Sequence, residues 1–246
     1  MSGKGAALIL GARSDIARAL ALELGARGRP LRLAGRDVEA LERDRADIAL
    51  RAKVEVTAHA YDAVDLAGID AFLDGLPETP EIVVSAVGLM GNQDENAADP
   101  ELAARVVASN FTGPALTLEA LARRMDEAGG RRAVIGISSV AGDRGRARNY
   151  VYGSAKAGFS EYLSGLRQKY ARRPLHVMTV KPGFVATAMT EGMDLPAPLT
   201  ATPEGLAKRV IRSMEKGRQV HYDFRWLAVM TIIKLIPEKI FMKLKF

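Results

Sequence analysis

Short apolar runs alternate with segments of helical periodicity along most of the chain. Residues 6–10 are all apolar and run into Gly11, after which apolar residues recur at helical spacing as far as Leu24. The first pattern is typical of a buried strand and the second of a helix with one apolar face. A further short strand, predicted at 31–34, completes a unit of about 30 residues, the length of a strand–helix–strand crossover.

The same alternation continues through the chain. Further strands are predicted at 53–58, 81–85, 133–137 and 175–180, and further helices at 38–52, 64–75, 99–128, 150–171 and 203–215. Apolar strands separated by helices favour a parallel sheet covered on both faces. We therefore predict an α/β fold: a single-domain, Rossmann-type, doubly wound parallel sheet over residues 1–224, with an amphipathic C-terminal extension over 225–246. The aperiodic segments 88–98 and 186–202 are predicted to be loops near a ligand site.

Composition narrows the class of protein. The chain has 246 residues, 48% of them hydrophobic, and no cysteine. These values indicate a folded domain with a sizeable core, and they exclude disulfides, thiolate metal sites and cysteine nucleophiles. No apolar run of signal-peptide length follows Met1, so a cytoplasmic location is expected. We predict no metal site, and no nucleic-acid partner because no basic stripe is interleaved with stacking aromatic residues.

The end of the first strand has the form of a phosphate-binding turn. It reads Gly11-Ala12-Arg13-Ser14-Asp15-Ile16-Ala17, and a helix is predicted to open within it. Such a turn aims backbone N–H groups at a pyrophosphate from the positive end of a helix. Asp15 stands where a glycine is usual, so we expect its carboxylate to point away from the phosphate and to cap the helix. The turn alone also fits an ordinary strand–helix junction. The candidate coenzyme ligands here are Gly11, Arg13, Ser14, Asp15 and Ile16.

The second strand ends in an arginine rather than an acid. Its last residues are Leu33-Ala34-Gly35-Arg36-Asp37. An acid at this place would hydrogen-bond the ribose 2′-hydroxyl of NAD, whereas an arginine suits the 2′-phosphate of NADP. Arg36 and Arg13 together offer two guanidinium groups to that phosphate. Asp37 is a contrary sign because it can pair with Arg36. NADP(H) is therefore favoured over NAD(H).

A tyrosine and a lysine form the candidate chemical centre. Tyr152 and Lys156 lie four residues apart on the predicted helix 150–171 and so share one face. The ammonium, together with a cationic nicotinamide, is expected to lower the pKa of Tyr152. Tyr152 can then exchange a proton with an alcohol or a carbonyl. Ser139, just after a buried strand, can hydrogen-bond the substrate oxygen. Asn110 lies within the helical stretch 99–128, where a buried amide can hold a water and bend the helix.

These motifs resemble those of the short-chain dehydrogenase/reductase family along roughly residues 5–215. Asn110, Ser139, Tyr152 and Lys156 match the family's catalytic tetrad in order and spacing. The resemblance implies that Tyr152 is the general acid/base and Ser139 the carbonyl polariser. It implies that Lys156 lowers a pKa and binds ribose, and that Asn110 anchors a proton-relay water. The implied protein is an NADP(H)-dependent oxidoreductase of a carbonyl or secondary alcohol, and a homo-oligomer.

The resemblance extends to the coenzyme segments. Lys181-Pro182-Gly183-Phe184-Val185-Ala186-Thr187 is similar to the family's proline–glycine segment, which implies that Pro182, Gly183, Val185 and Thr187 contact the carboxamide and diphosphate. Asp62, with Ala63 beside it, matches the residue that binds the adenine amine. Where the family has Asn-Ala-Gly, this chain reads Ser85-Ala86-Val87-Gly88. Either Ser85 replaces the asparagine or the loop is one residue longer.

The last 22 residues carry much of the positive charge. They hold five basic residues against one glutamate, in a chain whose formal net charge is +6. The longest uncharged run, residues 226–233, is far shorter than the roughly 18 residues that a membrane span needs. After Pro237, apolar residues share one face and Lys239 and Lys243 another, as in interfacial helices. Peripheral membrane contact and packing against the core or a partner subunit are both open.

The tail, the run 179–190 and the Gly-x-x-x-Asp-Ile-Ala turn resemble one branch of the family. Its members reduce a 2-keto sugar on a polyprenyl phosphate, the second step of decaprenylphosphoryl-ribose epimerisation. The resemblance implies a lipid-linked substrate and a place at the inner face of the membrane; a small-molecule carbonyl is the simpler substrate. The alternative function is a catalytically silent NADP-binding regulator or scaffold on the same fold, against which the intact tetrad argues.

Overall fold

A seven-stranded parallel sheet forms the centre of the protein. The computed structural model describes residues 4–244. The strands are β1 (Ala7–Leu10), β2 (Leu31–Gly35), β3 (Val56–Ala60), β4 (Ile82–Ser85), β5 (Arg132–Ile137), β6 (Leu175–Lys181) and β9 (Val220–Tyr222). They lie in the order β3-β2-β1-β4-β5-β6-β9, while β7 (Phe184–Val185) and β8 (Thr200–Ala201) pair separately. The predicted doubly wound α/β fold is confirmed.

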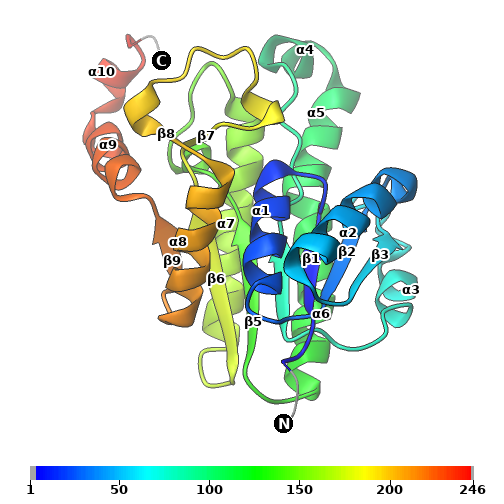
Figure 1. Cartoon of the computed structure of the whole chain (residues 1–246). Coiled ribbons are helices and arrows are strands. Elements are labelled where there is room, and N and C mark those ends of the chain that lie inside the picture. The colour runs from blue at the N-terminus through cyan, green and yellow to red at the C-terminus, as the bar shows by residue number, and fades with distance from the viewer. Residues whose placement is uncertain (1–3, 245–246) are drawn as a thin grey trace.

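Helices cover both faces of the sheet (Figure 1). The α-helices are α1 (Asp15–Gly25), α2 (Val38–Ala52), α3 (Ile69–Asp74), α4 (Gln93–Ala98), α5 (Pro100–Val107), α6 (Gly113–Glu127), α7 (Tyr150–Lys169), α8 (Pro203–Glu215), α9 (Phe224–Leu235) and α10 (Glu238–Phe241). A π-helical turn, η1 (Ala108–Thr112), joins α5 to α6, and short 3-10 turns occur at η2 (Val140–Asp143), η3 (Ala188–Thr190) and η4 (Ala197–Leu199). Helices α1, α2 and α8 pack on one face, and α3, α6 and α7 on the other.

The continuous apolar strands follow from this double cover. In β1, Ala7 and Ile9 belong to the core under α1, α2 and α8, whereas Leu8 and Leu10 belong to the core under α6 and α7. Successive side chains of a strand point to opposite faces, so a sheet with two buried faces needs apolar residues at every position.

Local side-chain hydrogen bonds shift several predicted boundaries. The helix predicted at 64–75 is reduced to α3, because Asp62 Oδ1 accepts from the Val64 N–H and Asp65 Oδ1 from the Gly68 N–H. These bonds hold 62–68 in turns. The stretch 99–128 is confirmed as helical but is interrupted by η1. Helix α4, inside the predicted loop 88–98, and strand β9 were not predicted, since both are short.

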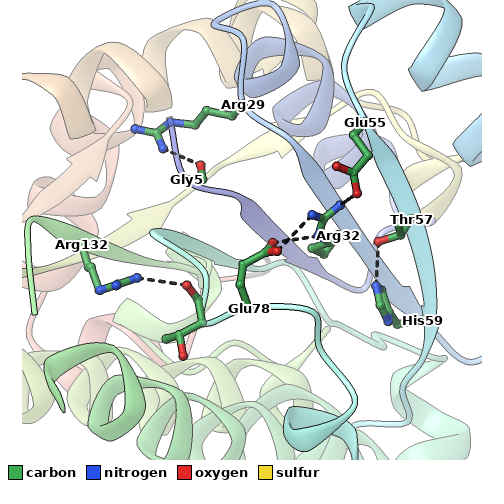
Figure 2. Close-up of polar contacts among 9 residues, drawn as sticks. Gly5, Arg29, Arg32, Glu55, Thr57, His59, Glu78 and Arg132 are labelled. Carbon is green, nitrogen blue, oxygen red and sulfur yellow. Dashed lines mark hydrogen bonds and ion pairs between the residues drawn. The ribbon is translucent and has the colours of Figure 1, made fainter. Parts of the chain in front are cut away.

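Charged contacts close the amino ends of the strands (Figure 2). The buried Arg32 guanidinium on β2 donates to Glu78 at 2.9 and 3.2 Å and to Glu55 at 2.7 Å. Nearby, Arg29 donates to the Gly5 carbonyl, and Arg132 to the carbonyls of residues 79 and 80. These contacts stabilise the end of the sheet opposite the one where the chemistry is expected.

The tail is folded onto the domain. The indole of Trp226 is buried, donates to the Leu199 carbonyl at 2.8 Å and meets the Phe184 ring edge-on at 4.9 Å. Met230, Ile233 and Phe241 bury the same side of α9 and α10 against Val140. Packing against the core, one of the two alternatives for the tail, is therefore observed.

The other side of the tail is exposed and apolar. Leu227, Ile232 and Leu235 are 50%, 66% and 77% exposed, and Ile240 and Met242 continue this surface on and beyond α10. Within residues 4–244, no helix is both long and apolar enough to cross a membrane. Lys245 and Phe246, the end of the predicted extension, lie outside the described residues.

Candidate active site

The phosphate-binding turn and the end of β4 lie in close contact. The strand order reverses between β1 and β4, the kind of place where α/β sheets bind ligands. Gly11 has φ +73°, and a Cβ there would lie 2.9 Å from the Val87 nitrogen and 3.0 Å from the Ala86 oxygen. Only glycine allows this approach. Ser85 ends β4, and its buried Oγ has no hydrogen-bond partner among the described residues.

Ser14 caps α1, so the expectation that Asp15 caps it was wrong. Ser14 Oγ accepts from the Ala17 N–H at 3.1 Å, as a residue just before the first helical turn does. Asp15 is already in that turn, and its Oδ2 accepts from the Ala188 N–H at 2.9 Å. Asp15 therefore fastens the loop after β7, next to Thr187, to the phosphate-binding turn. Ile16 packs against the core beneath.

Asp37 pairs with Arg13 rather than with Arg36. The Arg13–Asp37 distance is 3.1 Å, between side chains that are both half exposed. The other Asp37 oxygen accepts from the Ala40 N–H at 2.9 Å and caps α2. The capping geometry turns Asp37 towards α2, which leaves Arg36 without an ion pair among residues 4–244.

Asn110 sits at the centre of the π-helical turn. Its side chain is fully buried, and Nδ2 donates to the carbonyls of Leu89 at 2.6 Å and Val106 at 2.8 Å. The Leu89 N–H donates back to Oδ1 at 3.3 Å. The helical stretch is interrupted by the π-helical turn, and the Asn110 amide ties this turn to the loop after β4. π-Helical turns frequently mark functional sites.

Two glycines bring α7 against the segment that follows β5. A Cβ at Gly153 would lie 2.8 Å from the Ala141 oxygen, and one at Gly142 would lie 2.6 Å from the Ala157 nitrogen. This contact places Tyr152, on α7, beside Ser139, which caps η2, and the Ser139 side chain interacts with the phenol. The geometry brings together the two groups that were predicted to face the substrate oxygen.

Lys156 lies on the next turn of α7, inside the protein. Its side chain is 3% exposed, and Nζ donates to the carbonyls of Ile137 at 3.1 Å and Val87 at 3.3 Å. Nζ is 5.8 Å from the centre of the Tyr152 ring. Lys156 therefore joins the ends of β4 and β5 beneath the tyrosine.

The chain's own residues do not lower the pKa of Tyr152, contrary to expectation. Burial raises the pKa of this phenol to about 12, and the hydrogen bond with Ser139 only partly opposes the shift. Burial also lowers the pKa of Lys156 to about 7, so near neutral pH the lysine is only partly charged. Tyr152 is thus protonated over the physiological range.

The remaining predicted coenzyme residues occupy neighbouring loops. The Pro182 carbonyl accepts from the Val140 N–H at 3.0 Å, and Val185 is buried. Gly183 lies under Trp226, where a Cβ would come within 1.9 Å of the indole nitrogen. Thr187 forms a capping box with Thr190 over η3.

Asp62 and Ala63 lie in the loop after β3. The Asp62 side chain makes the local turn described above, and the Ala63 carbonyl packs so closely on Gly113 that any Cβ there would clash, at 1.7 Å. The loop is therefore held against the start of α6.

A buried polar network behind Ser139 was not anticipated. Asp143, the last residue of η2, accepts from Lys181 Nζ at 2.7 Å and from the Tyr222 hydroxyl at 2.5 Å. Arg144 donates to the carbonyls of Ile233 and Ile236 at 2.9 and 2.7 Å. No local pattern reveals such contacts, because their partners are 38 to 92 residues apart in sequence. They anchor the Ser139 segment to β6, β9 and the tail.

A family model described as short chain dehydrogenase matches residues 5–196. The chain belongs to the short-chain dehydrogenase family. This short-chain dehydrogenase is 34% identical over 241 residues to an uncharacterised oxidoreductase of Mycobacterium tuberculosis, with 96% of each protein covered. It is 31% identical over 243 residues to an uncharacterised oxidoreductase of Myxococcus xanthus, covering 96% of this chain and 94% of that protein.

Solved short-chain dehydrogenases share the fold. The enzyme of Sphingobium yanoikuyae in complex with NADPH superposes with a TM-score of 0.78 at 23% identity, covering 95% of this chain and 97% of that one. A family member of Burkholderia phymatum in complex with NAD gives a TM-score of 0.80 at 20% identity, covering 94% and 93%. The two neighbours bind different coenzymes, so the shared fold does not decide between NAD and NADP.

The buried lysine makes stability depend on pH in a defined direction. Between the folded pKa of about 7 and the unfolded value of 10.5, the unfolded chain binds more protons at Lys156, so stability rises with pH. We expect Lys156→Met to raise the free energy of unfolding at pH 7. It should also remove a slope of up to about 1.4 kcal/mol per pH unit from that window. The pKa of Tyr152 is raised, so its contribution to the free energy of unfolding changes with pH only above about pH 10.

Urea unfolding at pH 7.0 to 9.5 measures this slope. The exposed Lys208→Met serves as the control and should keep the wild-type slope. Equal slopes in the wild type and Lys156→Met would show that the lysine is not held in its neutral form.

Proposed function

We propose that this short-chain dehydrogenase is an NADP(H)-dependent reductase of a carbonyl group. The observation that carries the proposal is the adjacent pair Ser139 and Tyr152, with Lys156 one turn further along α7. A phenol that is protonated at neutral pH is suited to donate a proton to a carbonyl oxygen, as reduction requires.

The residues around the switch point fit a dinucleotide. Gly11 leaves a cradle that a Cβ would fill, and the Ser85 hydroxyl beside it is buried and unpartnered among the described residues. When bound, NADPH supplies the hydride. The residues proposed to hold it are Gly11, Arg13, Ser14, Asp15, Ile16, Arg36, Asp62, Ala63, Ser85, Ala86, Val87, Tyr152, Lys156, Pro182, Gly183, Val185 and Thr187.

Four residues would carry the chemistry at the substrate oxygen. Tyr152 donates its phenolic proton to that oxygen, and the Ser139 hydroxyl hydrogen-bonds it as negative charge develops. Lys156 holds the tyrosine's surroundings in place through the Val87 and Ile137 carbonyls. Asn110 keeps the loop after β4 against the π-helical turn. In this protein both the Nδ2 and the Oδ1 of Asn110 already have hydrogen-bond partners. A water for proton relay would therefore be held by backbone groups of η1 and not by the amide side chain.

Removing the phenolic proton tests the mechanism. We expect Tyr152→Phe to lower kcat for NADPH-dependent ketone reduction by about 100-fold or more, the usual contribution of a general acid. Tyr150→Phe, an exposed tyrosine on the same helix, is the matched control and should keep wild-type kcat. Full activity in Tyr152→Phe would contradict the proposal. A wild-type protein that binds NADPH but reduces no compound in a broad carbonyl screen would favour the silent regulator instead.

The preference for NADP rests on two arginines, Arg36 just after β2 and Arg13 in the turn after β1. Arg36 is exposed and free of acidic partners within residues 4–244, and Arg13 lies beside it on the neighbouring turn, paired with Asp37. This pairing shares Arg13 between two anions, which makes Arg36 the more important group for a 2′-phosphate.

Exchange of Arg36 should therefore discriminate the coenzymes. We expect Arg36→Ala to raise KM for NADPH about tenfold, the value of one charge-assisted hydrogen bond, while KM for NADH stays unchanged. Arg43→Ala, an exposed arginine on α2, is the control. Steady-state kinetics with both coenzymes measures the ratio, and a parallel change in both KM values would refute the preference.

The substrate class we propose is a keto-sugar carried on a polyprenyl phosphate. The tail supports it: the exposed apolar side chains Leu227, Ile232 and Leu235 lie among Lys234, Lys239 and Lys243. Apolar side chains flanked by lysines fit the surface of a bilayer that contains anionic lipid. The proposed location is therefore peripheral, at the cytoplasmic face of a membrane. A homo-oligomer stays a prediction of the family resemblance.

Two substitutions on the exposed side of α9 test the membrane contact without disturbing its buried side. We expect Ile232→Ser with Leu235→Ser to weaken flotation with phosphatidylglycerol vesicles at least about tenfold, because two large apolar side chains no longer enter the lipid. Leu50→Ser, at an equally exposed leucine on α2, is the control. Turnover of the lipid-linked keto-sugar should fall more than turnover of a water-soluble ketone. Unaltered flotation would contradict the proposed membrane contact of α9.

A further inference from the structure

A cavity of about 430 Å³ lies between η4, β8, α8, β9 and the start of α9. These elements follow one another along one edge of the molecule (Figure 1). None of the residues predicted to bind coenzyme or substrate lines this cavity. It is therefore separate from the hydride-transfer centre.

The walls of this cavity are strongly basic. Five cationic side chains line it, against the single carboxylate of Asp223: Arg209, Arg212, Lys216, Arg218 and Arg225. Arg209 pairs with Asp223 at 3.2 Å, and Arg225 donates to the Pro198 carbonyl. Arg212, Lys216 and Arg218 form no ion pair within the described chain. Like charges gathered in a concave surface repel one another and concentrate a field that attracts anions.

A buried histidine adds an unpartnered polar atom to the same wall. His221 is 6% exposed, and its Nδ1 shares a 2.8 Å hydrogen bond with Ser213 Oγ. Its Nε2 has no partner among the described residues, and neither does Arg209 Nε. Burial, followed by the nearby Arg209, lowers the pKa of His221 to about 4, so the ring is neutral at physiological pH. When the Ser213 hydroxyl donates to Nδ1, Nε2 carries the remaining proton and is a further donor.

We propose that this cavity binds the phosphate group of an anionic ligand, with Arg212, Lys216 and Arg218 as its principal charges. Guanidinium groups bind phosphate oxygens in a bidentate manner, and an anion would offset the repulsion among the three cations. The phosphate belongs either to a free phosphorylated metabolite or to a lipid headgroup. The neighbouring exposed side of α9 makes the lipid headgroup a natural source.

The cavity also adjoins the support of the catalytic serine. Tyr222 lines it, and the hydroxyl of Tyr222 donates to Asp143 in η2, the turn that Ser139 caps. A ligand in the cavity would thus lie one side chain away from the Ser139 segment. The site needs no assumption about hydride transfer, so it stands or fails separately from the proposed reductase.

Calorimetric titration with pyrophosphate tests the site. The full chain is titrated with NADPH at saturation, so that the coenzyme's own phosphate sites are filled. We expect Arg212→Ala with Lys216→Ala to weaken pyrophosphate binding about tenfold or more, because charge-assisted hydrogen bonds are lost. Arg218→Gln, a single exposed change, should weaken it as well. Lys208→Ala with Arg172→Ala removes the same two charges outside the cavity and should leave the affinity within about twofold. Tyr152→Phe should still bind pyrophosphate, which separates this site from the reductase mechanism.

Flotation with phosphatidylglycerol and phosphatidylcholine vesicles distinguishes the two sources. Flotation with phosphatidylglycerol that depends on Arg212 and Lys216 supports a headgroup. If pyrophosphate binding depends on these two residues but flotation does not, a free metabolite is supported. Two results would overturn the proposal. One is that neither pyrophosphate affinity nor flotation changes when Arg212 and Lys216 are replaced. The other is that replacing Lys208 and Arg172 weakens binding as much.

Discussion

The buried amino group of Lys156 makes the contacts on which the rest of the site depends. Its Nζ bonds the carbonyls of Val87 and Ile137, which follow or end the two central strands β4 and β5. Helix α7 is thereby locked to the sheet at one height, and Tyr152, one turn earlier, comes to lie beside Ser139. Burial of an amine is costly, and here it lowers the pKa of the lysine to about 7. The same exclusion of water strengthens the hydrogen bonds among the remaining groups.

The Ser139 segment is held from two directions. On the inner side, Gly142 and Gly153 allow the backbones of η2 and α7 to touch. On the outer side, Asp143 bonds Lys181 and Tyr222, and Arg144 bonds the carbonyls that end α9 and lies 4.0 Å from the centre of the Phe241 ring. The tail is therefore part of the scaffold of the candidate active site as well as a candidate membrane surface. A lipid that contacts α9 would act on an element already bonded to the Ser139 segment.

Many of the unpaired cations lie in two neighbouring parts of the fold. The tail contributes cations beside an exposed apolar surface, and α8 and the connection from α8 to β9 contribute three more to the neighbouring cavity. The elements α8, β9 and α9 follow β6 in the chain and lie along one edge of the molecule (Figure 1). At the opposite end of the sheet the arginines are paired, as Arg32 is with Glu55 and Glu78. This contrast supports the proposal that the unpaired cations of the cavity bind an external anion.

The sequence alone determined the alternation of strands and helices and the doubly wound class, because periodicity is a local property of the chain. It located the charged tail for the same reason. Its resemblance to the family predicted the tetrad Asn110, Ser139, Tyr152 and Lys156. Only the tertiary structure decided the pairing of Asp37 with Arg13, the reach of Asp15 to Ala188, the anchoring of η2 by Asp143 and Arg144, and the raised pKa of Tyr152. Each of these depends on burial or on a partner distant in sequence, and neither is encoded in the spacing of neighbouring residues.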